Sequence, residues 1–305
     1  MTPFERGTVV VITHNRRAQL MQTLRALGRS APGWPVIVVD NGSSDGTSRA
    51  VSREFPAIML IRSRRNIGAA ARNIAVAYVH TPYVAFCDDT TVWEPGALQH
   101  AVAVLEEHPG IGVISPRVMQ GDPPQLDPVC AAMALSPLEK GSLPGPQVLS
   151  FLAHACVMRT RAFYDVGGYW PPLFVGGEEA LMALDMAEQG WSMVYLENVV
   201  VRRRLARARN PRSIERRRLR NAVWVAWMRL PAGMAWRETM QQLRTAAQRR
   251  QLKAVLAITM PGMMRVLKAR HVVTARVSEM HARFVARATA GGATVAQQAA
   301  RSSMA

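Results

Sequence analysis

Short runs of apolar and β-branched residues alternate with helical patterns along the first 115 residues of the chain. This alternation predicts βα units that stack into a mostly parallel sheet flanked by helices, the Rossmann-like class of α/β protein. The expected strands are residues 8–13, 36–40, 58–61, 83–87 and 111–115, and the expected helices are residues 16–29, 45–54, 69–79 and 95–107.

The remaining residues show different patterns. A proline-rich stretch at 116–146 predicts a long ordered loop, a feature that often shapes a ligand site. An apolar segment at 151–158, a helix at 178–189 and a strand at 193–196 follow it. Beyond Arg202 the chain reads as basic helices with one apolar face. The residues that define these faces are Trp236, Met240, Leu243 and Ala247, then Val273, Val277, Met280 and Phe284.

The charge of the chain, +17 overall, is concentrated in its last third. Residues 1–200 hold 15 Lys and Arg against 18 Asp and Glu, whereas residues 201–305 hold 23 against 3. We therefore expect an α/β domain over 1–205, a basic helical extension over 206–290 and a disordered tail over 291–305. The basic extension could contact an anionic membrane surface or form solvated helices that pack on the core. Nucleic acid is the least favoured partner, because no recognised binding motif accompanies the charge.

The cysteine content and the lengths of the apolar segments predict the cellular compartment of the protein. The three cysteines, Cys87, Cys130 and Cys156, are widely separated and lack metal-ligand spacing, so neither a disulfide framework nor a zinc site is expected. The first residues show no secretory signal pattern, and no apolar run approaches the roughly 20 residues that span a bilayer. We expect a cytoplasmic protein that could lie peripherally at the inner face of the membrane.

Polar residues follow the expected strands, at the sheet edge where open α/β proteins bind ligands. Thr13 and Asn15 follow the first strand, Asp40 ends the second, and Asp88 and Asp89 follow a strand with the sequence YVAFC. Asp40 could accept a hydrogen bond from a base or a ribose, or could simply orient the βα turn DNGSSDG. The adjacent aspartates repel each other unless a cation or a proton relieves them, and a divalent ion bridging to a diphosphate is one remedy.

A second acidic pair, Glu178 and Glu179, follows two glycines where a helix is expected to begin. The helix dipole favours carboxylates at that position, so a structural role is one interpretation. The other is a catalytic base that deprotonates an attacking hydroxyl. His154 lies in the apolar segment FLAHACVM; a lone histidine there is more often a core or rim residue than a substrate contact.

Five segments, in this order, resemble family 2 glycosyltransferases. They are VVVITHNRRAQLMQTLRAL, PVIVVDNGSSDGT, RNIGAAARN, TPYVAFCDDT and FYDVGGYWPPLFVGGEEALMALDMAEQGWSMVYLENVVV, and together they cover residues 8–201. The resemblance implies a GT-A fold and a hexosyltransferase that moves a sugar, with inversion, from a nucleotide-diphosphate donor of the UDP or dTDP type to an unidentified acceptor.

The resemblance also implies roles for individual residues. Glu179, with Glu178 beside it, would be the catalytic base, and Asp89 would hold a Mg or Mn ion. The nucleotide would contact Thr13, Asn15, Asp40, Gly68, Asn73 and Asp88.

This sequence departs from the family pattern at two places. Thr90 stands where a third acidic residue is common, and arginines stand where many members have a histidine after the last strand. Arginine has no lone pair for a metal, so Arg202 and Arg204, on one face of the strand, could instead neutralise the diphosphate. Metal dependence is therefore open. So are two other functions, a degenerate protein that binds nucleotide without turnover and a membrane or nucleic-acid binding module on this scaffold.

Overall fold

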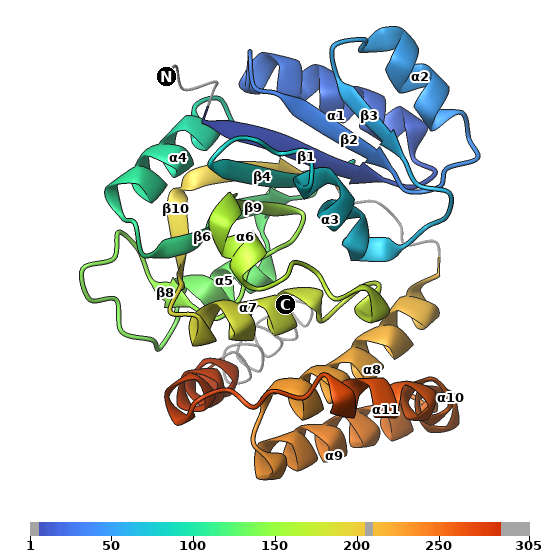
Figure 1. Cartoon of the computed structure of the whole chain (residues 1–305), viewed down its shortest axis with the longest axis vertical. Helices are drawn as coiled ribbons and strands as arrows, with labels where there is room; N and C mark the ends of the chain where they lie inside the picture. The colour runs from blue at the N-terminus through green and yellow to red at the C-terminus, as the bar shows by residue number, and fades with distance from the viewer. Residues whose placement is uncertain (1–5, 205–209, 288–305) are drawn as a thin grey trace, which may run out of the picture.

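The computed structural model describes residues 6–204 and 210–287, and its centre is one mixed β-sheet (Figure 1). Along the sheet the strands follow the order β3-β2-β1-β4-β9-β6-β10-β5, with β7 paired to β6 and β8 paired to β10. The strands are β1 (Gly7–Thr13), β2 (Val36–Asp40), β3 (Met59–Arg62), β4 (Tyr83–Asp88), β5 (Thr91–Trp93), β6 (Ile111–Gln120), β7 (Gln125–Leu126), β8 (Gln147–Val148), β9 (Ala155–Arg159) and β10 (Ser192–Arg203).

Parallel pairing in the N-terminal half aligns the carboxyl ends of three strands. β1 lies between β2 and β4 and is parallel to both, with Thr13 beside Asp40 and Ile12 beside Asp88. The next strand, β9, runs antiparallel to both β4 and β6. The sheet is therefore mixed, and the expected α/β class is confirmed.

Helices pack against this sheet. α3 lies on β1 and β2, while α4 packs on β6, β9 and β10 and α7 on β10. The near-continuous apolar runs of the buried strands account for this arrangement, because β1 and β4 are buried over most of their length and need cover on both faces. The helices of this half are α1 (Arg17–Ser30), α2 (Thr47–Glu54), α3 (Ala71–Val76), α4 (Ala97–Glu107), α5 (Pro128–Ala134), α6 (Thr160–Asp165) and α7 (Glu178–Glu188), with short 3₁₀ turns η2 (Gly68–Ala70) and η3 (Pro171–Leu173).

Two expectations from the sequence are wrong. The stretch 116–146 is not one long loop, since β6 continues to Gln120 and is followed by β7, α5 and then β8. The side chain of Asp127 accepts a hydrogen bond from the Val129 amide and Pro128 occupies the first helical position, which explains why α5 forms within a proline-rich sequence. The last strand is also longer than 193–196, because β10 pairs with β6 as far as Arg203.

The C-terminal helices contribute to the core of the sheet and also form a small cluster of their own, made of Leu219, Ala246, Val255 and Leu252. Trp224, Val225, Val266, Val273 and Val277 belong to the same buried cluster as the central strands. The second apolar pattern of the sequence is therefore a packing face, whereas Trp236 of the first pattern is exposed. These helices are α8 (Pro211–Arg229), α9 (Ala232–Gln248), α10 (Leu252–Thr259), the 3₁₀ turn η4 (Met260–Gly262), α11 (Met263–Lys268) and a helix over 275–287.

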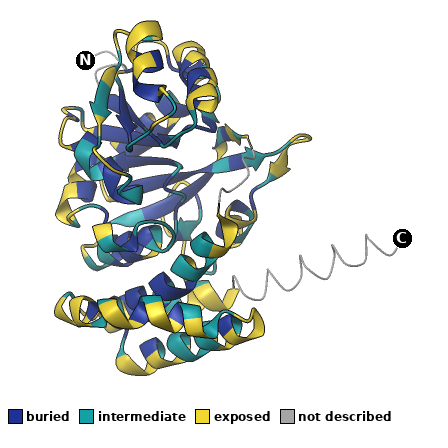
Figure 2. Cartoon of the chain, turned by 90° about the vertical axis from the view of Figure 1, so that its right-hand side faces the viewer, coloured by how far each residue is buried: buried dark blue, intermediate teal, exposed yellow. Residues whose placement is uncertain are grey.

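Figure 2 shows exposed residues along the outer sides of these helices. Within 6–204 and 210–287, no helix has the length and apolar character needed to cross a membrane. The expected boundary at 205 and the expected tail at 291–305 both lie outside the described residues, so they stay predictions.

Candidate active site

The βα turn after β2 is organised around the Asp40 carboxylate. Its Oδ1 accepts a hydrogen bond from the Ser43 amide at 2.8 Å, and its Oδ2 accepts one from the Ser48 hydroxyl. Asp40 is only 2% exposed, and its carboxylate stabilises the turn in which it lies. Asn15, with a left-handed φ of 53°, ties the neighbouring loop to this turn through its Oδ1, which accepts from the Ser44 amide at 2.7 Å. The structural interpretation of the turn thus accounts for its hydrogen bonds, and the nucleotide role of Asp40 and Asn15 stays a prediction.

Gly68 and Asn73 both hold the segment that precedes α7. Gly68 has a φ of 65°, and a Cβ at this position would lie 2.0 Å from the carbonyl oxygen of Phe174. Asn73 donates from Nδ2 to the Tyr169 carbonyl at 2.8 Å and accepts at Oδ1 from the Tyr169 amide at 2.9 Å. These two residues therefore fix how the chain around 169–174 approaches the sheet edge.

The two adjacent aspartates point to different partners. Asp89 accepts hydrogen bonds from the Thr13 hydroxyl at 2.9 Å and from the Arg16 guanidinium at 3.2 Å. Burial and the charge of Asp88 together raise the pKa of Asp89 to about 6, although Arg16 and Thr13 oppose the rise. Arg16 thus neutralises much of the charge of Asp89 within the protein.

Asp88 has a different set of partners. Its Oδ1 accepts from the Thr90 amide at 2.9 Å and from the Thr90 and Thr91 hydroxyls at 2.7 Å each. Its Oδ2 lies 3.8 Å from a guanidinium nitrogen of Arg203. Burial opposes ionisation of Asp88, but electrostatic interactions with His154 and Arg203 and the threonine hydrogen bonds together lower its pKa.

The position of His154 is set by the strand register at this edge. Cys87 pairs with Ala155 in the antiparallel ladder of β4 and β9, so His154 lies across from Asp88. Burial and the charge of Arg203 together lower the pKa of His154 to about 4, although the charge of Asp88 opposes this. The imidazole is therefore neutral near pH 7, so Arg203 is the cation that balances Asp88 at that pH.

The carboxylates at this edge already have hydrogen-bond and ion-pair partners within the protein. Both oxygens of Asp89 are engaged by Thr13 and Arg16, and Asp88 is occupied by two threonines and Arg203. Among the described residues, no group of three or more His, Cys, Asp or Glu side chains is placed to bind one ion. The expected metal ion would have only Asp89 and donor oxygens as ligands, so the role of Asp89 at a metal stays a prediction.

The arginines that end β10 alternate in the opposite sense to the expected one. Arg202 pairs with Glu94, next to β5, and Arg204 donates to Gln22 and to the Thr23 hydroxyl on α1. Arg203 is the residue that approaches Asp88. The β10 ladder continues past residue 196 and places Arg203, rather than Arg202 or Arg204, beside Asp88. The expectation that Arg202 and Arg204 together neutralise the diphosphate stays a prediction.

The second acidic pair opens α7, as the sequence predicts. Gly176 and Gly177 adopt left-handed φ values of 78° and 91°, which place Glu178 at the first helical position. The Asn221 side chain on α8 fixes the preceding segment by donating to the carbonyls of Leu173 and Val175 at 2.8 and 3.1 Å and to that of Gly176.

The two carboxyl groups of the pair differ in burial. Glu178 is 6% exposed, and burial together with the charge of Glu179 raises its pKa to about 8. Glu179 is half-buried. Near pH 7 Glu178 is therefore mostly protonated, and Glu179 is the more accessible carboxyl group of the two.

Several buried polar atoms between the end of β4 and the start of α7 lack a hydrogen-bond partner. The Arg72 guanidinium lies 5.6 Å from the ring centroid of Tyr169, and its charge also acts on the pKa values of His154 and Glu178. Buried groups of this kind are normally satisfied, so the atoms indicate hydrogen-bonding capacity for a ligand or water. The atoms are Arg72 Nε, His154 Nε2, Tyr169 OH, Glu178 Oε2 and Arg203 Nε.

Sequence reasoning missed three cations of this site. Arg16 and Arg72 lie within segments that carry the family resemblance, HNRR and AARN, and their position beside acidic strand ends could have indicated them. The importance of Arg203 could not be read locally, because it depends on the length of β10.

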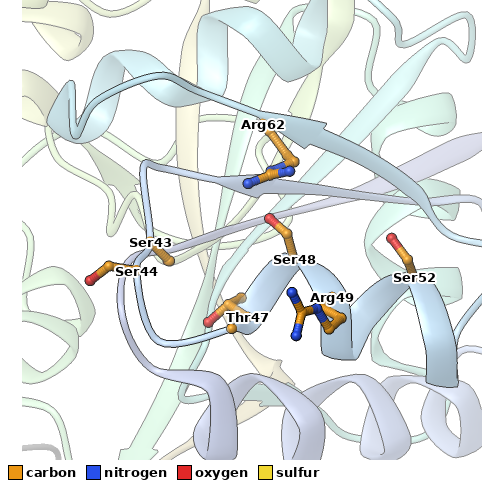
Figure 3. Close-up of a pocket in the computed structure, with 8 residues that line it drawn as sticks. Ser43, Ser44, Thr47, Ser48, Arg49, Ser52 and Arg62 are labelled. Carbon is orange, nitrogen blue, oxygen red and sulfur yellow. The ribbon is translucent and has the colours of Figure 1, made fainter.

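A cavity of about 530 Å³ lies beside the turn after β2 (Figure 3). Ser48 on α2 and Arg62 at the end of β3 point toward one another in it, and Arg49 contributes a second guanidinium. Hydroxyl and guanidinium groups suit an anionic or polyhydroxylated ligand. The lining residues are Ser43, Ser44, Gly46, Thr47, Ser48, Arg49, Ser52 and Arg62.

Comparisons with known proteins agree with this architecture. The chain is 23% identical over 233 residues to an N-acetylglucosaminyl-diphospho-decaprenol L-rhamnosyltransferase of Mycobacterium tuberculosis, a match that covers 63% of this chain and 74% of the relative. Among solved structures it resembles S. aureus TarS 1-349 in complex with UDP-GlcNAc, with a TM-score of 0.60, 15% identity, and coverage of 96% and 92% of the two chains. It also resembles a mannosyltransferase of Pyrobaculum calidifontis in complex with GDP-Man and Mn²⁺, with a TM-score of 0.55, 20% identity, and coverage of 95% and 88%.

These likenesses confirm the GT-A fold. The model of the glycosyl transferase family 2 matches residues 8–167, which is more than half of the chain. That match spans the strand ends that carry Thr13, Asp40 and Asp88, the edge described above. The chain therefore belongs to glycosyl transferase family 2 and is a glycosyltransferase.

Proposed function

We propose that this enzyme transfers a hexosyl group, with inversion, from a nucleotide-diphosphate donor to an acceptor hydroxyl by in-line displacement. The observation that carries the proposal is the shared edge of β1, β2 and β4, where polar side chains gather opposite the N-terminus of α7. The nucleotide would lie along Thr13, Asn15, Asp40 and Asp88. A donor of the UDP or dTDP type is expected, since bound UDP-GlcNAc occurs in one solved relative.

Glu179 is proposed as the base that takes the proton of the attacking hydroxyl. A general base must be ionised at the working pH and accessible to the substrate. Glu178 is buried and mostly protonated near pH 7, whereas Glu179 is half-buried at the same helix terminus. In this proposal Glu178 is a hydrogen-bond donor that fixes the geometry beside the base.

The leaving diphosphate is proposed to be balanced partly by arginine. Phosphoryl oxygens bind guanidinium groups well, and Arg203 lies beside Asp88 with a buried Nε that has no partner. The neutral imidazole of His154 offers one further hydrogen bond from the opposite strand. Mn²⁺ is bound in a solved relative, whereas Asp88 and Asp89 here each have an arginine partner, so we expect activity that only partly depends on Mg or Mn.

The acceptor is proposed to be a lipid-linked sugar, and the enzyme to work in the cytoplasm at the inner face of the membrane. The mycobacterial relative is named for a decaprenol-linked diphosphate acceptor. Nucleic acid is not expected to be a partner. A degenerate protein that binds the donor without turnover is the second candidate, favoured by the hydrogen bonds that already occupy Asp40 and Asp89.

A thermal-shift series with UDP, dTDP and GDP, with and without manganese, tests donor binding, because a ligand that binds the folded state stabilises it by mass action. We expect stabilisation by UDP or dTDP without manganese. A sugar-release assay with the matching nucleotide sugar then separates the two candidates. Binding with no release and no transfer would favour the degenerate protein, and no stabilisation by any nucleotide would contradict the donor site.

A further inference from the structure

The helical segment from α10 to α11 presents large apolar side chains to solvent. Leu256, Met260, Met264 and Leu267 are 37%, 63%, 68% and 46% exposed. Their spacing of four, four and three residues places them on one side of a helix. We call these four residues the outer stripe.

The opposite side of the same segment is anchored to the core. Val255, Thr259 and Val266 are buried, and the Trp224 indole donates to the Thr259 carbonyl at 3.1 Å. A Cβ at Gly262 would lie 2.1 Å from the Trp224 ring, so the backbone packs directly on that indole. The segment therefore cannot rotate to bury the outer stripe, and within the described residues the stripe stays open to solvent.

Only positive charge surrounds the outer stripe in sequence. Lys253 precedes it, Arg265 lies within it and Lys268 follows it, and all three are exposed. No Asp or Glu occurs from residue 239 to residue 278. A row of exposed apolar side chains flanked by basic residues complements an anionic lipid surface, where the apolar groups enter the headgroup boundary and the cations meet lipid phosphates.

We propose that the outer stripe with Lys253, Arg265 and Lys268 is a docking surface for an anionic lipid bilayer. It belongs to the C-terminal extension, outside residues 8–167, and does not depend on the identity of the donor. Docking there would keep the enzyme on the membrane by contacts that are separate from its catalytic edge.

Sedimentation of the full chain with vesicles tests this surface. The chain should pellet with vesicles of phosphatidylcholine and phosphatidylglycerol, and should stay in the supernatant with phosphatidylcholine alone. Met264→Glu should weaken the partition by on the order of 10-fold or more, since it removes an apolar group and adds a repelled charge. Lys253→Glu combined with Lys268→Glu should weaken it by on the order of 30-fold or more, since it removes two cations and adds two repelled charges.

Matched controls separate the surface from general charge. Met59→Glu alters a methionine on β3 that is 46% exposed, and Arg53→Glu with Arg161→Glu reverses two exposed charges outside the extension; both variants should pellet like the wild type. Melting curves check that every variant is folded. The proposal is overturned if the wild type binds anionic vesicles no better than neutral vesicles and the stripe variants bind anionic vesicles as well as the wild type does.

Two other occupants give distinct results that also overturn it. If an RNA competitor abolishes vesicle binding and Met264→Glu binds vesicles as well as the wild type, the partner of this surface is a nucleic acid. If the wild type does not bind vesicles but self-associates in sedimentation velocity, and Met264→Glu abolishes this self-association, the surface binds a second copy of this chain.

Discussion

Replacing Glu178 with glutamine should remove a pH dependence from the stability of the folded chain. Glu178 is 6% exposed, and its burial together with the charge of Glu179 raises its pKa from 4.5 to about 8. A carboxyl whose pKa is raised in the folded state stabilises the fold fully below its unfolded pKa, and this contribution is lost as the pH rises through the folded pKa. The affected window therefore runs from about pH 4.5 to about pH 8.

The size of the effect follows from the difference between the two pKa values. At about 1.4 kcal/mol per pKa unit, the interval between pH 5 and pH 8 corresponds to at most about 4 kcal/mol. We expect about 2 to 4 kcal/mol, because the interaction with Glu179 spreads the titration over the pair. Glutamine stays neutral, so the stability of Glu178→Gln relative to the wild type should increase by this amount from pH 5 to pH 8.

Urea unfolding followed by circular dichroism at pH 5, 6, 7 and 8 measures this difference. Glu107→Gln, at an exposed position on α4, is the matched control for the loss of one carboxyl group. A difference between Glu178→Gln and the wild type that stays constant from pH 5 to pH 8 would refute the reasoning. It would mean that Glu178 is already ionised in the folded protein at pH 5.

Other perturbations address the donor and the chemistry. Glu179→Gln should lower turnover by on the order of 100-fold or more with donor binding nearly unchanged, as measured by initial rates and thermal shift; a stronger defect in Glu178→Gln would reverse the assignment of the base. Asp40→Ala should abolish nucleotide stabilisation and also cost about 1–3 kcal/mol of stability, because the Ser43 amide loses its partner. Ser48→Ala keeps the carboxylate and should keep nucleotide binding, so equal nucleotide affinity in both variants would remove Asp40 from the site. Activity should persist at a reduced level in excess chelator, and Arg203→Ala should abolish that residual activity while Arg202→Ala does not. Complete loss of wild-type turnover in chelator would restore a metal-dependent mechanism.

The strand ends of the site could be predicted from sequence because their signals are local. The β-branched runs that become β1, β2 and β4 are read within a few residues, as are the turn after Asp40 and the two glycines before Glu178. Parallel pairing of consecutive βα units then brings those ends together without further information. The acidic edge and the start of α7 are therefore properties of the sequence itself.

The partners of the acidic residues were decided only by the tertiary structure. Whether Arg202 or Arg203 faces Asp88 depends on how far β10 pairs with β6, and His154 reaches Asp88 only because β9 enters the sheet antiparallel beside β4. Both are pairings between residues about 65 to 115 positions apart, which no local pattern encodes.

The same division holds for the extension. Its helices and their basic charge follow from sequence periodicity and composition, since both are properties of short windows. The sequence does not show which apolar residues of the extension are buried, because Val273 and Val277 enter the core whereas Met260 and Met264 remain in solvent. The orientation of Met260 and Met264 is set by the Trp224 indole beneath Gly262, a contact between residues 38 positions apart that only the packed structure creates.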